Sequence, residues 1–357
     1  MTLQTEPGRG LVDLVRELER RLTGEAPGPG LEPELADSIR HAPTYVLVLF
    51  DGLGHHQLAH RSARTLAGSV AGILEVPIPT TTTVSMATIA AGHPPSEHGV
   101  LSHLMWLPDM ERVVNVLKWV TLSGSPLPYD YRGFIPAPNL WERLSARGIE
   151  PITVQPGDFA RSPLTQVLYR GCRFEPVYSA DEAVEATVAL AREPNRLIFT
   201  YLPQVDFAAH LWGQSSSEYG QAMGVVDTVW SQVTARSGAS VVGTADHGHL
   251  DYRTEDKILI EGFGDLTFFG DSRTLFVNGD RERISELARQ VDAEPVFVGS
   301  DGGPWTGASE RVLARAPVAV LPAPTGRLLL PRGFDKRLVG YHGGSLPEEV
   351  QVPLLVG

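Results

Sequence analysis

The sequence predicts an α/β fold with a doubly wound, mainly parallel sheet flanked by helices and a small cap or inserted region. Three apolar runs of strand length support this prediction: residues 45–50 (YVLVLF), 197–201 (LIFTY) and 240–244 (SVVGT). Helical patterns lie between them, so strands and helices alternate as they do in parallel βαβ units. With 357 residues and 42% hydrophobic content, the chain can bury the core of such a domain.

Each apolar run leads into an aspartate. Asp51 ends the first run, Asp206 follows the second and Asp246 follows the third. Because the carboxyl ends of parallel strands meet at one edge, where open α/β sheets bind ligands, the three carboxylates can converge.

The helical patterns support the domain boundaries. Residues 11–22 carry one apolar stripe and precede a Gly/Pro-rich stretch, so residues 1–43 are expected to be an N-terminal helix and linker. Two further stretches, NLWERLSARG and DEAVEATVALAREP, open on a capping residue and close on Gly or Pro. Residues 44–357 then form the main domain, with the less regular residues 250–331 as the cap or insert.

Composition excludes several classes of function. The net charge of -12 leaves no basic face for a nucleic acid backbone. A single cysteine, Cys172, excludes an intrachain disulfide and a cysteine-based metal site. No apolar stretch approaches the roughly 18 residues of a membrane span, and no leader pattern is present, so a cytoplasmic protein is expected.

Two short motifs have metal-ligand character. Asp206 and His210 lie one turn apart if their segment is helical, close enough to share a cation. Asp246 and His247 are adjacent in TADHGHLD, where neighbouring ligands can reach a metal only from a loop turn. For His247 alone, a solvent-facing loop histidine is an equal alternative.

A run of four threonines, TTTT, precedes a helical stretch and offers a nucleophile. A threonine hydroxyl on a divalent cation at a helix N-terminus is stabilised as the alkoxide. Thr82 is the candidate, with Thr81 and Thr83 as rivals. Without the other motifs, a strand end with an N-cap threonine would be the preferred interpretation.

In order, the DGLG, PTTTT, D-x-x-x-H, ADHG and late G-x-H-G-G motifs resemble the nucleotide pyrophosphatase/phosphodiesterase branch of the alkaline phosphatase superfamily. The resemblance runs from about Tyr45 to the C-terminus and implies an alkaline phosphatase-like fold with two zinc ions. Manganese or another divalent ion is an alternative, because mixed Asp/His sites accept several metals. The residues implied to contact the two ions are, for the first, Asp206, His210 and His342, and for the second, Asp51, Asp246, His247 and the nucleophile Thr82.

One position departs from the family pattern. Where relatives carry an asparagine that holds a phosphoryl oxygen, this chain has His103, which can donate the same hydrogen bond. His103 is therefore a candidate catalytic residue, and a pocket-wall or solvent histidine is an equal alternative.

The resemblance implies a two-zinc hydrolase that cleaves phosphodiester or pyrophosphate bonds of a small phosphate ester or nucleotide through a covalent threonine intermediate. A phosphomonoesterase or phosphonoacetate-type hydrolase is the alternative, since the same metals and threonine serve those reactions. A metal-stabilised binding protein without catalysis is less favoured, because all the expected positions are occupied. Sulfatase activity is not expected, since the surroundings of Cys172 (GCRFEP) lack the C/S-x-P-x-R motif. The sequence leaves the oligomeric state open.

Overall fold

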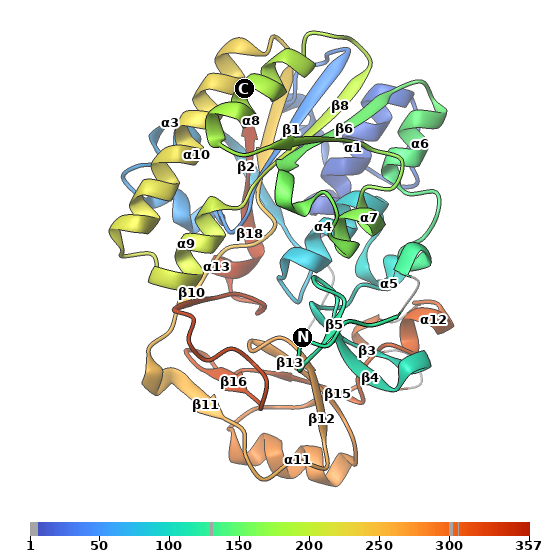
Figure 1. Cartoon of the computed structure of the whole chain (residues 1–357), viewed down its shortest axis with the longest axis vertical. Helices are drawn as coiled ribbons and strands as arrows, with labels where there is room; N and C mark the ends of the chain where they lie inside the picture. Colours follow the sequence, from blue (N-terminus) through green and yellow to red (C-terminus); the bar gives the residue numbers. More distant parts are fainter. Residues whose placement is uncertain (1–5, 129–130, 300–302, 306) are drawn as a thin grey trace.

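The chain folds around two sheets, which lie one above the other in Figure 1. The computed structural model describes residues 6–128, 131–299, 303–305 and 307–357. The strands of the larger sheet are, in spatial order, β2 (Val70–Glu75), β18 (Gln351–Val356), β9 (Ser240–Thr244), β1 (Thr44–Phe50), β8 (Arg196–Leu202), β6 (Glu150–Pro156) and β7 (Arg173–Val177).

This larger sheet confirms the predicted mainly parallel architecture. β1 pairs in parallel with β8 and β9, and β6 pairs in parallel with β7 and β8. Only β18 runs antiparallel, against β2 and β9. Every residue of β1 is buried, as expected of an apolar strand covered on both faces.

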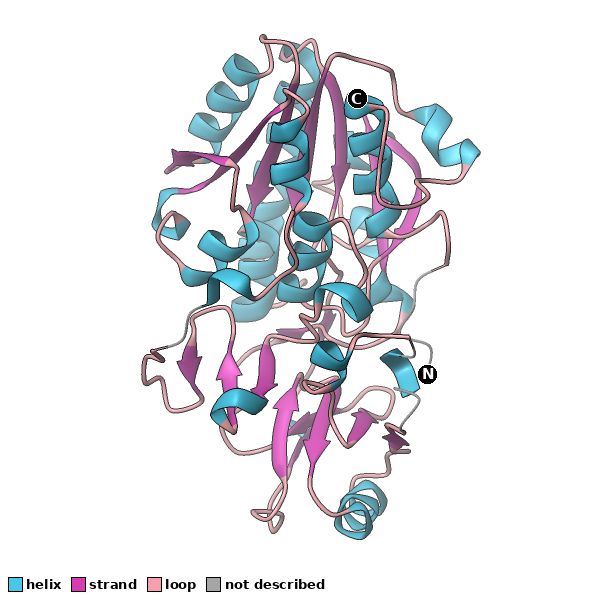
Figure 2. Ribbon diagram, turned by 90° about the vertical axis from the view of Figure 1, so that its right-hand side faces the viewer, coloured by secondary structure: helices cyan, strands magenta, loops and turns pink. Residues whose placement is uncertain are grey.

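Helices lie on both sides of the larger sheet, which makes the fold doubly wound (Figures 1 and 2). The helices of one group pack around the longest helix and comprise α3 (Arg64–Gly68), α8 (Ala180–Leu190), α9 (Gln204–Trp212) and α10 (Ser217–Arg236). The other group comprises α1 (Leu11–Thr23), α4 (Thr82–Ala91), α6 (Leu140–Ala146) and α7 (Pro163–Leu168).

The predicted N-terminal helix is α1. Its apolar stripe, with Leu11, Leu14 and Leu18 fully buried, packs against α4 and α6. Short helices complete the upper and middle parts of the molecule: α2 (Pro33–Ser38), α5 (Pro95–His98) and α13 (Pro347–Val350).

The second sheet is antiparallel and forms the lower part of the molecule (Figure 1). In spatial order its strands are β14 (Val296–Phe297), β15 (Ala319–Pro322), β13 (Thr274–Asn278), β12 (Thr267–Gly270), β3 (Leu104–Leu107), β4 (Arg112–Asn115) and β5 (Val120–Thr121). Two small sheets pair β10 (Leu250–Asp251) with β17 (Gly340–Tyr341), and β11 (Lys257–Leu259) with β16 (Leu328–Leu330). The helices of this part are α11 (Arg281–Gln290) and α12 (Glu310–Leu313).

Two separate chain segments build this second sheet. The sequence placed the insert at residues 250–331, and the sheet also takes β3, β4 and β5 from residues 104–121. The two segments meet where Gly270 of β12 pairs with Leu104 of β3. Residues 1–5 of the predicted N-terminal segment, and 300–302 and 306 of the predicted insert, lie outside the described residues.

Among the described helices, none combines the length and the apolar character that crossing a membrane requires.

Candidate metal centre and active site

Three carboxylates converge at the carboxyl ends of neighbouring strands. Asp51 follows β1, Asp246 follows β9, and Asp206 lies in the first turn of α9, directly after β8. The backbone N–H of Asp206 donates to the carbonyl oxygen of Asp51 over 3.0 Å, which fixes these two segments side by side. The sheet edge thus brings together the three aspartates that the sequence predicted to meet.

Each of these carboxylates keeps one buried oxygen that has no hydrogen-bond partner among the described residues: Asp51 Oδ1, Asp206 Oδ1 and Asp246 Oδ2. Such atoms are costly, because a buried polar group loses its water without gaining a donor. The opposite oxygens of two of them are held in place: Tyr201 donates its hydroxyl to Asp51 Oδ2, and the Gly52 N–H donates to Asp246 Oδ1 over 3.0 Å. The free oxygens are therefore oriented for a cation.

Three histidines complete the centre with a shared arrangement. In each ring Nδ1 lies next to a backbone carbonyl oxygen, so a Nδ1–H tautomer leaves the Nε2 lone pair for a metal. The pairs are His210 with Gly340 at 2.7 Å, His342 with Thr80 at 2.7 Å, and His247 with Gly248 at 3.2 Å.

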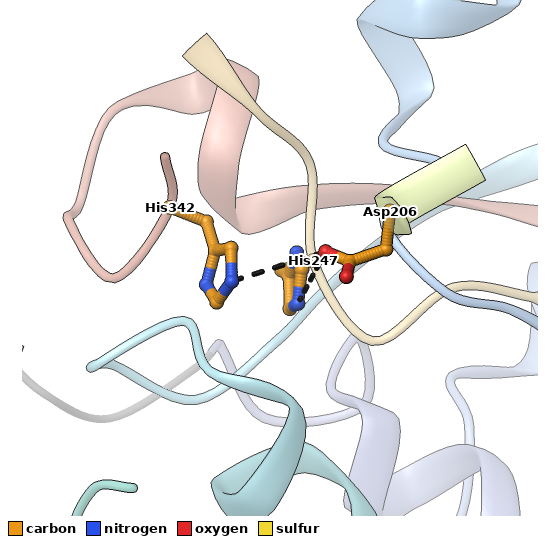
Figure 3. Close-up of side chains that lie close together, drawn as sticks. All are labelled: Asp206, His247 and His342. Atoms are coloured by element: carbon orange, nitrogen blue, oxygen red, sulfur yellow. Dashed lines mark ion pairs between the residues drawn. The ribbon is translucent and has the colours of Figure 1, made fainter. Parts of the chain in front are cut away.

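The ligand atoms form two groups that could each hold a metal ion. In one group, atoms of Asp206, His247 and His342 all lie within 4.8 Å of one another (Figure 3). In the other, atoms of Asp51, Asp246 and His247 do so. His210 joins the first group, because its Nε2 lies 3.3 Å from Asp206 Oδ1. Mixed oxygen and nitrogen donors of this kind suit a divalent cation.

The members of the first group are far apart in the sequence. In Figure 3, Asp206 lies in the first turn of α9, and His247 and His342 extend toward it from two separate loops. The sequence assigned Asp206, His210 and His342 to one ion. The structure brings His247 to both groups, with its Nε2 4.0 Å from Asp206 Oδ1 and 3.5 Å from Asp51 Oδ1.

Burial sets the charge states of this centre. Burial raises the pKa of Asp246 to about 6, and burial together with Asp206 and Asp246 raises the pKa of Asp51. Burial also lowers the pKa of His247 to about 4 and that of His342 to about 3. Both imidazoles are thus neutral at pH 7, as metal ligands must be, and the crowded carboxylates need compensating positive charge.

Thr82 is the threonine that faces the centre. It is the first residue of α4, and its Oγ1 lies 3.2 Å from His247 Nε2. The alternative candidates Thr81 and Thr83 are buried, and their Oγ1 atoms lie 3.2 Å from each other. The helix dipole of α4 therefore points its positive end at the Thr82 hydroxyl.

His103 stands apart from both groups. It precedes β3, and its Nδ1 lies 3.2 Å from Oδ2 of Asp271, in the turn between β12 and β13. Asp271 was not predicted, because no local sequence pattern marks it. Its contact with His103 joins the two segments that pair in the second sheet, where Gly270 lies opposite Leu104.

His249 also belongs to the centre, although the sequence-based ligand set omits it. The ring is fully buried, and Nε2 lies 3.4 Å from Asp206 Oδ1. In the part of the chain that the structure describes, neither ring nitrogen has a hydrogen-bond partner. Gly52 makes room for the ring, since a Cβ there would lie 2.4 Å from its Nε2. The signal available in the sequence was the second histidine of ADHGH.

Comparison with known proteins identifies the family. The sequence model of the family described as type I phosphodiesterase/nucleotide pyrophosphatase matches residues 45–266, more than half of the chain. The chain belongs to this family. Membership makes the protein a hydrolase of phosphate esters, and it agrees with the resemblance found in the sequence. No curated protein matches the chain.

Solved structures confirm the alkaline phosphatase-like fold of the chain. Murine ectonucleotide pyrophosphatase/phosphodiesterase 5 is 18% identical, with 87% of each chain covered and a TM-score of 0.66. An inactive variant of that protein in complex with AMP gives 17% identity over 87% of each chain, with a TM-score of 0.65. Phosphonoacetate hydrolase from Sinorhizobium meliloti 1021, in complex with phosphonoacetate, is 17% identical over 87% of this chain and 89% of its own, with a TM-score of 0.63.

Proposed function

We propose that this protein hydrolyses phosphodiester or pyrophosphate bonds of small molecules, with two zinc ions and Thr82 as the nucleophile. The observation that carries the proposal is the position of the Thr82 hydroxyl, at the N-terminus of α4, 3.2 Å from Nε2 of His247. The same Nε2 lies within 4.0 Å of one carboxylate oxygen of each of the three aspartates. The first ion would be held by Asp206, His210 and His342, and the second by Asp51, Asp246 and His247.

When bound, the two cations supply positive charge to the phosphoryl oxygens and to the attacking and leaving oxygens. Thr82 Oγ1 loses its proton to solvent and bonds to phosphorus, while the bond from phosphorus to the leaving oxygen breaks and that oxygen takes a proton from solvent. A water molecule then cleaves the phosphothreonine and restores the hydroxyl. The N-terminus of α4 stabilises the negative charge on Oγ1 in both steps.

Two of the similar structures suggest which substrates to compare. AMP occupies the inactive murine protein, which supports a nucleotide substrate. Phosphonoacetate occupies the bacterial hydrolase, which supports a phosphonoacetate-type or monoester substrate as the second candidate. Both candidate reactions need the same nucleophile. They are therefore distinguished by comparing substrates and not by the residues of the centre.

The test is hydrolysis by protein that is stripped of metal and then reloaded with zinc. We expect faster turnover of bis-p-nitrophenyl phosphate and of nucleoside p-nitrophenyl esters than of p-nitrophenyl phosphate or phosphonoacetate, and no turnover by the stripped protein. Asp206→Asn is the variant to compare with the parent protein. It keeps the side-chain volume but removes the charge of Asp206, whose Oδ1 lies within 4.0 Å of a ring nitrogen of each of four histidines. A preference for p-nitrophenyl phosphate or phosphonoacetate would favour the second candidate, and turnover without metal would contradict the proposal.

A further inference from the structure

The carboxylate of Glu349 is fully buried and accepts four hydrogen bonds. Its Oε1 accepts from the Gly344 N–H over 2.8 Å and from Nε of Arg273 over 3.3 Å. Its Oε2 accepts from the Leu346 N–H over 3.3 Å and from Nη2 of Arg273 over 3.2 Å. Because the four groups that bond to it are all donors, the site suits an ionised carboxylate, which has only acceptors.

The loop that these bonds hold carries His342. Gly344 lies two residues after His342, and its carbonyl oxygen accepts the Thr80 hydroxyl over 3.1 Å. The carbonyl oxygen of Thr80 in turn lies 2.7 Å from Nδ1 of His342. A Cβ at Gly344 would lie 2.3 Å from Oε2 of Glu349, which shows how closely the loop lies against the carboxylate. The carboxylate therefore fixes the backbone on which the orientation of the His342 ring depends.

The backbone of Glu349 contacts a second loop of the metal centre. Its carbonyl oxygen accepts the N–H of Gly248, the residue after His247, over 3.0 Å. A Cβ at Gly248 would lie 2.0 Å from the carbonyl oxygen of Glu348, so α13 and this loop are in close contact. The rings of His247 and His342, side by side in Figure 3, stack with centroids 3.7 Å apart. A shift of either loop would change the spacing of these two imidazoles.

Arg273 connects this arrangement to the second sheet. It directly precedes β13, and its side chain is almost completely buried. Its Nη1 donates to the carbonyl oxygen of Arg327 over 2.9 Å, and its guanidinium lies over the ring of Tyr252. A guanidinium that bonds a carboxylate through two nitrogens fixes its orientation as well as its distance. The position of Glu349 therefore depends on how the second sheet packs against the larger one.

We propose that Glu349, oriented by Arg273, is a positioning residue of the metal centre. It sets the spacing of the His247 and His342 imidazoles and so determines how tightly the ions bind. Neither Glu349 nor Arg273 belongs to the two groups of ligand atoms, so both act through the loops. The inference rests on the proposed function, because it concerns the metal centre of that function, and it gives the second sheet a part in metal binding.

The test is Glu349→Gln, whose side-chain NH2 would face two of the four donors. We expect zinc affinity, measured by chelator competition, to fall by about tenfold to a hundredfold, as is typical for groups that orient ligands. The visible absorption bands of the cobalt-substituted protein should shift, because the spacing of the imidazoles changes. Arg273→Lys keeps the charge but not the two-nitrogen contact, so it should lose less zinc affinity than Arg273→Met.

Glu19→Gln is the matched control. Glu19 is also buried and also pairs with an arginine through two nitrogens, those of Arg143, over 2.7 and 2.8 Å. Arg143 contacts the carbonyl oxygen of Ala91, at the opposite end of α4 from Thr82. The control should lower the melting temperature but leave the zinc affinity and the cobalt spectrum unchanged. Equal changes of zinc affinity in the two variants, or no change in Glu349→Gln, would overturn the inference.

Hydrogen exchange of the metal-free protein shows whether the loops themselves respond. Glu349→Gln should speed exchange in peptides that cover residues 343–346 and 247–250, and Glu19→Gln should not. Faster exchange without a loss of zinc affinity would make the ion pair a purely structural contact and overturn the inference.

Zinc binding and turnover together separate the inference from the proposed function. If zinc affinity depends on Glu349 as expected but the parent hydrolyses no phosphate ester, the proposed function fails and the inference stands. If zinc-dependent turnover is found but Glu349→Gln binds zinc as tightly as the parent, the inference fails alone. A parent that binds no zinc would overturn both. Should Glu349→Gln not fold, Arg273→Lys decides, and unchanged zinc affinity in that variant would overturn the inference.

Discussion

Thr82 Oγ1 lies 3.2 Å from Nε2 of His247, the one imidazole that belongs to both groups of ligand atoms. The hydroxyl is therefore at the junction of the two groups, and its helix begins at the same residue. A nucleophile placed there would be within reach of either ion.

Thr82→Ala should abolish covalent catalysis. We expect kcat to fall by about a hundredfold or more, equivalent to about 2.7 kcal/mol of activation free energy, with zinc content unchanged. Rapid quenching and mass spectrometry should detect a phosphorylated peptide containing Thr82 in the parent only. Thr82→Ser keeps a hydroxyl and should retain most of the activity, and an alanine variant as active as the parent would exclude the covalent mechanism.

The hydroxyl of Tyr201 should strengthen metal binding through Asp51. It donates to Asp51 Oδ2 and so orients Oδ1, which has no protein partner, toward the centre. Tyr201→Phe should weaken zinc binding by about tenfold to a hundredfold, as is typical for groups that orient ligands. Chelator competition measures this effect.

Tyr219→Phe is the matched control for that variant. Tyr219 is also buried, but its hydroxyl has no hydrogen-bond partner among the described residues, so its removal should leave zinc affinity unchanged. Equal effects of the two substitutions would show that Tyr201 acts only through packing.

His249 should contribute to the metal site through Asp206. Its buried ring nitrogens lack partners, and Nε2 lies 3.4 Å from Asp206 Oδ1. His249→Gln should lower zinc affinity by about tenfold while changing the melting temperature of the metal-free protein little, because the ring nitrogens form no hydrogen bond there with any described residue. Unchanged zinc affinity combined with a lower melting temperature would make His249 a packing residue.

Local sequence patterns predicted the central strands and the aspartates, because apolar runs such as residues 240–244 define both the strand and the loop that follows. The register of β1 with β8 and β9 then brings these loops together. His342 needed the family resemblance, since its contact with Thr80 spans most of the chain. Asp271 could not be predicted: its contact depends on β3, from one segment, pairing with β12, from another.

Metal affinity should depend on pH through His210. Burial alone would lower the pKa of His210, but Asp206, 3.3 Å away, raises it to about 9. The folded-state pKa is above the unfolded value, so this ion pair contributes its full stability below about pH 6.5 and loses it as pH rises through about 9.

Zinc must displace the proton of His210, because a metal-bound imidazole is neutral. Between pH 7 and 9 we expect release of about one proton and a rise in zinc affinity of about tenfold per pH unit. Asp246, with a pKa of about 6, contributes mainly at lower pH, and the His210→Gln variant separates the proton of His210 from that of Asp51, whose pKa burial also raises. Calorimetry in two buffers of different ionisation enthalpy counts the protons. The count should fall in His210→Gln, and an equal count in parent and variant would show that the proton comes from another group.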